Sequence, residues 1–260
     1  MMFLTNHFSL HQVRKIVVAL LIYAIGSFSA YSESCDKNVY LTFDTGNMAV
    51  AEKVATILRE QHVKATFFLA NEKTYRHDYA LEESWKTFWT SLLKDGHRIG
   101  SHTFNHTYWI KDIGQDKVLV QSQFGPMAGK KITLSSMEFC KEIKSVDDQF
   151  HRLTGSSLSK IWRAPGGKTS ARSIEFGKAC GFTHIGWSPA GFLGDELPSE
   201  KFSNPALLKR ALQDLKDNDI TMAHLGIWSR KDPWAPAVLE PLIIGLKERG
   251  FCFKRIGDAP

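Results

Sequence analysis

Long runs of charge of one sign, linker-like stretches and Cys-x-x-Cys motifs are all missing from this sequence. It has 33 Lys and Arg against 27 Asp and Glu in 260 residues, and basic residues never run longer than pairs such as Lys130-Lys131. This pattern does not predict a nucleic-acid partner. No low-complexity segment divides the chain, and its length suffices for one sizeable core, so we expect a single domain.

The longest apolar stretch is too short for a membrane span. Two cations precede an uncharged segment, residues 16–30, whereas a span needs roughly 20 residues. Residues 30–32 have the small-x-small pattern of a cleavage site. We therefore interpret residues 1–32 as a secretory signal peptide and residues 33–260 as an exported domain, in the periplasm, outside the cell or at the cell wall, without stable membrane insertion. An uncleaved anchor is the alternative. A lipoprotein site at Cys35 is disfavoured, because a charged residue lies where a small apolar one is usual.

Short apolar strands alternate with amphipathic helices along the mature chain. Strands are expected at residues 39–43, 65–70, 98–101, 160–163, 183–187, 220–224 and 251–254. Helices are expected at residues 49–61, 82–94, 135–153, 170–180, 206–215 and 236–249. Ser135 and Glu138 form a capping-box pattern at the start of the third helix. Strands separated by helices form a parallel sheet. Seven such units predict an α/β fold, a distorted or incomplete (β/α)7-type barrel in a single domain.

Polar side chains stand at the ends of four different predicted strands. They are Asp44, His102, Arg163 and His224. In a barrel the carboxyl ends of the strands converge on one rim, where such folds place their chemistry. His106 follows His102 by one helical turn or one tight loop, a spacing that suits two imidazole ligands of a metal. The sequence therefore predicts a site at this rim.

Four motifs, in this order and spacing, resemble those of the polysaccharide deacetylases, also called the NodB-homology family or carbohydrate esterase family 4. They are Thr42-Phe43-Asp44-Thr45-Gly46, Ser101-His102-Thr103-Phe104-Asn105-His106, Arg163-Ala164-Pro165-Gly166-Gly167 and Met222-Ala223-His224. The resemblance covers residues 38–256. It implies a metal-dependent hydrolase that removes N-acetyl groups from the amino sugars of an N-acetylated polysaccharide. Peptidoglycan is the polymer that an exported bacterial-type enzyme would meet first, and zinc is the metal that we expect.

The resemblance also implies a role for each motif residue. His102 and His106 would bind the metal, and Asp44 would take the proton from water. Arg163 would pair with Asp44 and hold it ionised, while His224 would protonate the departing amine. Each residue has a structural alternative as well: Asp44 as a turn residue, Arg163 in a rigid loop exit, and His224 as a core histidine.

Two positions depart from the family pattern. Thr45 stands where the family has a second aspartate that completes the metal site, so the site loses one negative charge. Waters could complete the metal shell, or a carboxylate such as Asp195 could reach in from a loop. Ala190 replaces the carboxylate that usually supports the acid histidine, which leaves the protonation of His224 open.

Aromatic residues near the rim are candidates for sugar binding. Trp228 and Trp234 follow the last motif, and Trp109 lies in the long segment 107–134. Pro165, in the third motif, completes the predicted substrate-binding set. The alternative is that the tryptophans only pack or anchor their loops.

Two other classes of function are considered. The chain could bind amino-sugar polymers without hydrolysing them, as Thr45 and Ala190 would permit, but a binding module has no use for an acid and a base. It could also hydrolyse a small amide or cyclic imide, although the export signal and the rim aromatics favour a polymer. The sequence gives no indication of the oligomeric state.

Four cysteines could form disulfides in an oxidising compartment, or remain free buried thiols. We predict a Cys35–Cys252 pair, because barrel closure brings the first and last strands side by side. Cys140 and Cys180 are expected near opposite ends of their helices, where a bridge is geometrically awkward.

Overall fold

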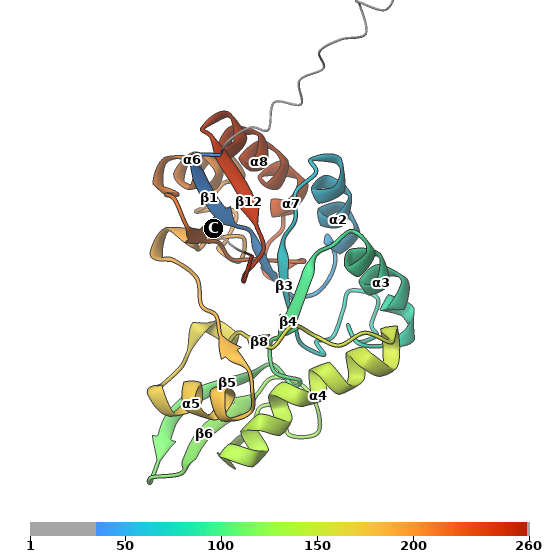
Figure 1. The fold of residues 1–260 in the computed structure, drawn as a ribbon, viewed down its shortest axis with the longest axis vertical. Helices are drawn as coiled ribbons and strands as arrows, with labels where there is room; N and C mark the ends of the chain where they lie inside the picture. Colours follow the sequence, from blue (N-terminus) through green and yellow to red (C-terminus); the bar gives the residue numbers. More distant parts are fainter. Residues whose placement is uncertain (1–34, 259–260) are drawn as a thin grey trace, which may run out of the picture. The chain divides into compact units, whose positions relative to one another are not determined.

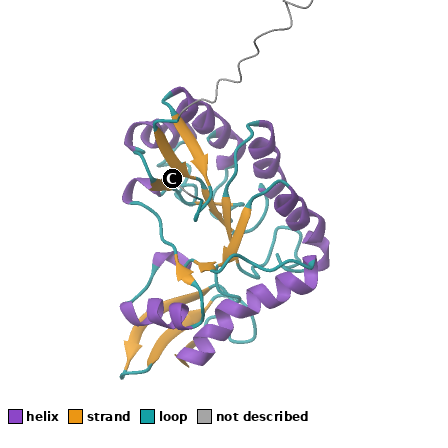
Figure 2. Cartoon of the chain, viewed as in Figure 1, coloured by secondary structure: helices purple, strands orange, loops and turns teal. Residues whose placement is uncertain are grey.

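The computed structural model describes residues 35–258, so the predicted signal peptide at residues 1–32 lies outside the described residues. From Cys35 onward the chain forms one unit in which helices lie along the outer side of the parallel strands (Figures 1 and 2). In the described range, no helix has the length and hydrophobicity needed to cross a membrane.

The strands and helices alternate much as the sequence predicts. The parallel strands are β1 (Lys37–Tyr40), β2 (Thr42–Asp44), β3 (Thr66–Leu69), β4 (Arg98–Ser101), β8 (Ile161–Trp162), β9 (Thr183–His184), β10 (Asp219–Ile220), β11 (Ala223–His224) and β12 (Phe251–Lys254). The α-helices are α2 (Ala51–Glu60), α3 (Lys86–Lys94), α4 (Ser136–Thr154), α5 (Ala171–Ala179), α6 (Asn204–Asp214), α7 (Trp234–Ala237) and α8 (Leu239–Glu248). Short 3₁₀ turns are η1 (Glu83–Trp85), η2 (Pro165–Gly167) and η3 (Pro189–Gly191).

The parallel strands follow a closed path. One sheet has the order β10-β1-β12 and the other β11-β2-β3-β4-β8-β9. Only Leu41 separates β1 from β2, so one extended stretch belongs to both sheets. Beyond β9, the Ser188 amide donates to the Ile220 carbonyl at 3.0 Å, which joins the end of the second sheet to β10. The predicted distorted (β/α) barrel is therefore confirmed.

The barrel core explains why the central strands are apolar throughout. All four residues of β3, Thr66–Leu69, are buried, as expected for a parallel strand with both faces covered. Phe43 of β2 stacks on Phe67 of β3 with ring centroids 5.4 Å apart. At the start of α4, Ser135 and Glu138 form the predicted capping box. This rigid frame fixes where the strand ends, and hence the motif residues, can lie.

A third sheet, antiparallel, occupies residues 107–135, where the sequence predicts no strands. β5 (Thr107–Ile113), β6 (Lys117–Ser122) and β7 (Lys131–Ser135) pair antiparallel in sequence order. Val118 and Val120 of β6 are fully buried in a smaller core, together with Trp162 and residues of α4. β5 begins immediately after His106, so this sheet forms a wall beside the rim.

The four cysteines form two disulfides. The predicted Cys35–Cys252 bridge is confirmed, with Cα atoms 5.5 Å apart. The prediction that a Cys140–Cys180 bridge is geometrically awkward is wrong, because these residues are also bonded, at a Cα separation of 5.5 Å. The start of α4 lies against the end of α5, and the two helices pack together. Opposite helix ends therefore meet instead of lying apart.

Candidate active site

The rim brings the predicted aspartate and the three predicted histidines around one small cavity of about 80 Å³. β2 and β11 are neighbours in register, which places Asp44 beside His224. His102 follows β4, and Arg163 follows β8, the neighbour of β4. The cavity is lined by Asp44, His102, His106, Tyr108, Gly166, Trp187, Glu196, Met222 and His224.

Asp44 and Arg163 form a buried ion pair, as predicted. Arg163 Nη1 lies 2.9 Å from Asp44 Oδ1, and both side chains are almost inaccessible to solvent. Three more guanidinium hydrogens are donated to Thr42 Oγ1 and to the carbonyls of Ile185 and Gly186. Burial, the largest single influence, would raise the pKa of Asp44, but the Arg163 guanidinium together with His102 and His224 outweighs it and holds that pKa below its usual value. Asp44 is therefore an ionised acceptor at neutral pH.

His102 and His106 face each other across a tight loop, with ring centroids 4.9 Å apart. Thr103 and His106 both have positive φ, at 62° and 48°, which turns the loop sharply enough to bring the rings together. His102 Nδ1 lies 3.0 Å from the Arg163 carbonyl, which can only accept, so the proton belongs on Nδ1. Nε2 is then left with a lone pair, 3.6 Å from Asp44 Oδ2. Burial lowers the pKa of His106 to about 3, so its imidazole is also neutral.

These imidazoles fit a divalent metal in their chemistry, but they do not complete a site. Two lone-pair donors, His102 Nε2 and Asp44 Oδ2, point at one another, an arrangement that favours a cation near them. Thr45 does not contribute, because its hydroxyl donates to the Phe68 carbonyl and accepts from the Ala70 amide. Among residues 35–258, no three His, Cys, Asp or Glu side chains are grouped as a metal site. The side chains as they stand supply two ligands and leave a third position unassigned.

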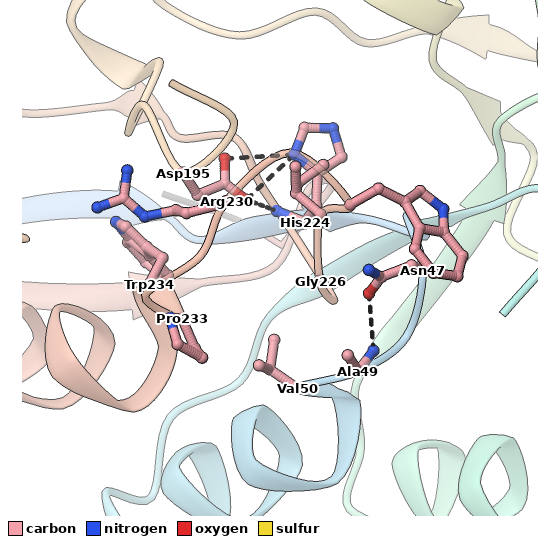
Figure 3. A pocket seen from close by; sticks show the side chains of 11 residues that line it. Asn47, Ala49, Val50, Asp195, His224, Gly226, Arg230, Pro233 and Trp234 are labelled. Atoms are coloured by element: carbon pink, nitrogen blue, oxygen red, sulfur yellow. Dashed lines mark hydrogen bonds and ion pairs between the residues drawn. The ribbon is translucent and has the colours of Figure 1, made fainter. Parts of the chain in front are cut away.

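His224 has the carboxylate partner that the sequence analysis considered missing. Asp195 accepts from the His224 amide at 2.7 Å and lies 3.1 Å from its Nδ1 (Figure 3). The suggestion that Asp195 could reach the metal is therefore wrong, because both its oxygens are directed to His224. Burial, the largest single influence, opposes the charged imidazole, but the Asp195 carboxylate together with Asp44 and Glu196 outweighs it and raises the pKa of His224 to about 9. Asp195, in a loop, supplies the carboxylate partner of His224 that Ala190 cannot supply.

If His224 is the acid that the sequence predicts, its raised pKa implies a specific pH profile. His224 can donate a proton only below its folded-state pKa of about 9, so kcat/KM should fall as the pH rises through that value. The His224–Asp195 ion pair stabilises the fold fully below the ordinary histidine pKa of about 6.5. This stabilisation is lost as the pH rises from there through the folded-state pKa of about 9. Asp195→Asn should move the basic limb of the profile to lower pH.

Glu196→Gln is the matched control, because the exposed Glu196 carboxylate lies 4.0 Å from His224 Nε2. It should shift the limb less than Asp195→Asn. Identical basic limbs in the wild type and Asp195→Asn would contradict the assignment of His224 as the titrating acid.

The predicted substrate-binding residues do not all reach the site. Trp228 is 62% exposed and lines two cavities beside His224, of about 250 and 350 Å³. Trp234 is buried and lines the smaller one (Figure 3). Trp109 lies elsewhere: its ring packs on the smaller core that contains Val118 and Val120, and its Nε1 donates to Asp112. Pro165, the first residue of η2, is buried and lines none of these cavities.

Three functional candidates were missed by the sequence analysis. Tyr108 takes the place predicted for Trp109, because alternate residues of a strand point to opposite faces. Its ring lies 5.0 Å from that of His106. Glu72 and Glu196 are carboxylates that line the larger cavity with His106. Burial raises the pKa of Glu72 to about 8. Only Glu72 carried a usable signal, since it follows a buried strand by three residues.

Known proteins resemble this chain in sequence and in fold. The polysaccharide deacetylase family matches residues 31–185. A peptidoglycan-N-acetylglucosamine deacetylase of Bacillus cereus is 24% identical over 227 residues, which cover 86% of this chain and 88% of that protein. A family 4 carbohydrate esterase from Streptomyces lividans, solved with acetate, superimposes with a TM-score of 0.61 at 19% identity, covering 86% of this chain and 95% of that chain.

A CE4 family pseudoenzyme from Bacillus anthracis also has a similar structure. Its TM-score is 0.62 at 18% identity, over 85% of this chain and 64% of that chain. At such identities the structural likeness establishes the fold alone.

Proposed function

Because the chain belongs to the polysaccharide deacetylase family, we propose that it hydrolyses N-acetyl groups on amino sugars of an extracytoplasmic polysaccharide, with peptidoglycan as the polymer. Relatives named for the deacetylation of peptidoglycan N-acetylglucosamine and N-acetylmuramic acid support this polymer. A relative named as a chitooligosaccharide deacetylase has a similar 24% identity, so chitin-like oligomers are the comparison substrate.

The observation that carries this proposal is a base and an acid of opposite charge facing one cavity. Asp44 is held ionised by Arg163, and His224 is held protonated by Asp195. One pH therefore supports both forms, as amide hydrolysis requires. Asp44 accepts a proton from water, whose oxygen bonds to the acetyl carbon. His224 gives its proton to the sugar nitrogen as the C–N bond breaks, which leaves acetate and a free amine.

His102 and His106 are the residues that would hold a divalent metal, for which we propose zinc. When bound, zinc supplies a Lewis acid that polarises the acetyl carbonyl. The protein keeps the two histidines ready for this role. The Arg163 carbonyl fixes the His102 tautomer, and burial keeps His106 uncharged.

One observation favours a second candidate, a module that binds amino sugars without hydrolysis. The Thr45 hydroxyl is bonded to backbone atoms, so the two histidines lack the ligand that the family places there. Such a module would bind the polymer and release no acetate at any zinc concentration.

The decisive experiment measures acetate release from N-acetylated peptidoglycan, with the purified protein first treated with a chelator and then titrated with zinc. We expect release to require zinc and to be slower on N-acetylated chitin oligomers. Polymer binding without acetate release at any zinc concentration would establish the second candidate instead.

Trp228 is expected to serve as a platform for a sugar ring. Its exposed face beside His224 contributes little to folding, so Trp228→Ala should leave the melting temperature unchanged. Loss of one aromatic stacking contact of about 1.4 kcal/mol should raise KM for the polymer roughly tenfold, with a smaller effect on kcat. Steady-state kinetics on a soluble peptidoglycan fragment measures this.

Trp228→Phe keeps an aromatic face and should recover most of the affinity. Ile244→Ala removes another exposed apolar side chain, on α8, and should leave KM unchanged. A wild-type KM in Trp228→Ala would show that the ring does not contact the substrate.

A further inference from the structure

Glu72 lies between the two loops that carry the candidate metal site. On one side, its Oε1 accepts from the amide of Gly46, the residue after Thr45, at 3.1 Å. On the other side, the preceding residue, Asn71, donates its amide to the carbonyl of Phe104, in the loop between the two histidines, at 2.9 Å. The Glu72 side chain is only 7% exposed. Its carboxylate is thus buried at the position where the first motif and the histidine loop approach each other.

The second carboxylate oxygen of Glu72 is not used by the fold. Within residues 35–258, Oε2 makes no hydrogen bond, and the side chain lines the cavity of about 350 Å³ that His106 and His224 also line. Buried carboxylates are normally paired with a cation or bound to a metal. No Lys or Arg side chain forms an ion pair with Glu72 in the described part of the chain.

The other acidic groups of the cavity already have partners. Asp44 is paired with Arg163, and both oxygens of Asp195 are directed to His224. The Glu196 side chain is 47% exposed and faces His224 Nε2. Among these carboxylates, Glu72 is the one that is buried, shares a cavity with His106 and has only a backbone amide as a partner, with no charged side chain of residues 35–258 paired to it.

We propose that Glu72 is the third protein ligand of the divalent metal held by His102 and His106, and that it replaces the negative charge lost at Thr45. This inference rests on the proposed metal-dependent function. Glu72 is not grouped with both histidines as the side chains stand, so its side chain must rotate from the Gly46 amide toward His106 when the metal binds. Two imidazoles and one carboxylate form a common three-residue zinc site.

Zinc affinity, measured by competition with a chromophoric chelator, tests this ligand independently of activity. Glu72→Gln keeps an acceptor for the Gly46 amide but removes the carboxyl group that would ionise on binding zinc, so a purely structural Glu72 predicts unchanged affinity. Removing groups that merely support a ligand weakens metal binding by about 10–100-fold, and we expect at least a hundredfold loss in Glu72→Gln. The control, Glu240→Gln, removes a carboxylate on α8 that lines none of the three cavities, and it should bind zinc as the wild type does. Equal zinc affinity in Glu72→Gln and the wild type would overturn the inference.

A crystal structure of the wild-type protein soaked in zinc gives a second test that needs no variant. We expect a Glu72 oxygen at about 2.0–2.2 Å from the metal. A zinc ion bound to His102 and His106 with Glu72 still on the Gly46 amide overturns the assignment, and so does a wild type that binds no zinc. Acetate release by the wild type separates the two proposals: if release persists while Glu72 is shown not to bind zinc, only this inference fails.

Discussion

Asp44→Asn should lower the rate of acetate release by about 10²–10⁴-fold, the usual contribution of a positioned general base. Asparagine has nearly the same size as aspartate and can still accept a hydrogen bond from Arg163, but it cannot take a proton from water. Binding of the polymer should change little, so kcat should carry most of the loss. Acetate release and melting temperature measured on the same samples distinguish a catalytic role from a structural one.

Arg163→Ala should be nearly as harmful, because it frees Asp44 and leaves a buried carboxylate without its counter-ion. The double variant should lose much less than the sum of the two effects, since the pair acts as a unit. Folded Asp44→Asn protein that turns over at the wild-type rate would refute the assignment of Asp44 as the base.

Replacing His102 and His106 together by alanine should abolish zinc retention and reduce acetate release to background. The imidazoles are the two neutral donors that the rim presents side by side, and no cysteine is available to substitute, because all four are in disulfides. Elemental analysis of the purified double variant measures the metal directly.

His184→Ala is a suitable comparison, because His184 is a half-buried histidine at the end of β9 that lines none of the three cavities described above. It should retain zinc. Acetate release that survives in the His102/His106 double variant would rule out the metal-dependent mechanism.

The strand-end residues could be predicted from sequence because a parallel barrel leaves little freedom. Once β2, β4, β8 and β11 are recognised as strands, Asp44 and His224 must lie at the same rim. The Asp44–Arg163 ion pair follows from this geometry. The local sequence pattern is equally informative at the start of α4, where Ser135 and Glu138 predict the capping box.

Loop contacts could not be predicted in the same way. Asp195 reaches His224 from a position 29 residues away, and no periodic pattern specifies where a loop directs its side chains. The β5–β7 sheet was missed because only part of its residues alternate between buried and exposed. Trp109 was assigned to the wrong face for the same reason, since a one-residue difference along a strand exchanges the two faces.

The Cys35–Cys252 bridge has a consequence for the order in which this chain can be completed. β1 lies between β10 and β12, and the cysteine that bonds to Cys35 is the second residue of β12. β1 is the first strand to leave a ribosome or a translocation channel, and it cannot pair with β12 until the end of the domain has also emerged. A chain truncated before residue 251 would lack the bridge to Cys35 and would expose one edge of β1, which invites pairing with another chain. The Cys35–Cys252 disulfide can therefore form only in chains that include β12.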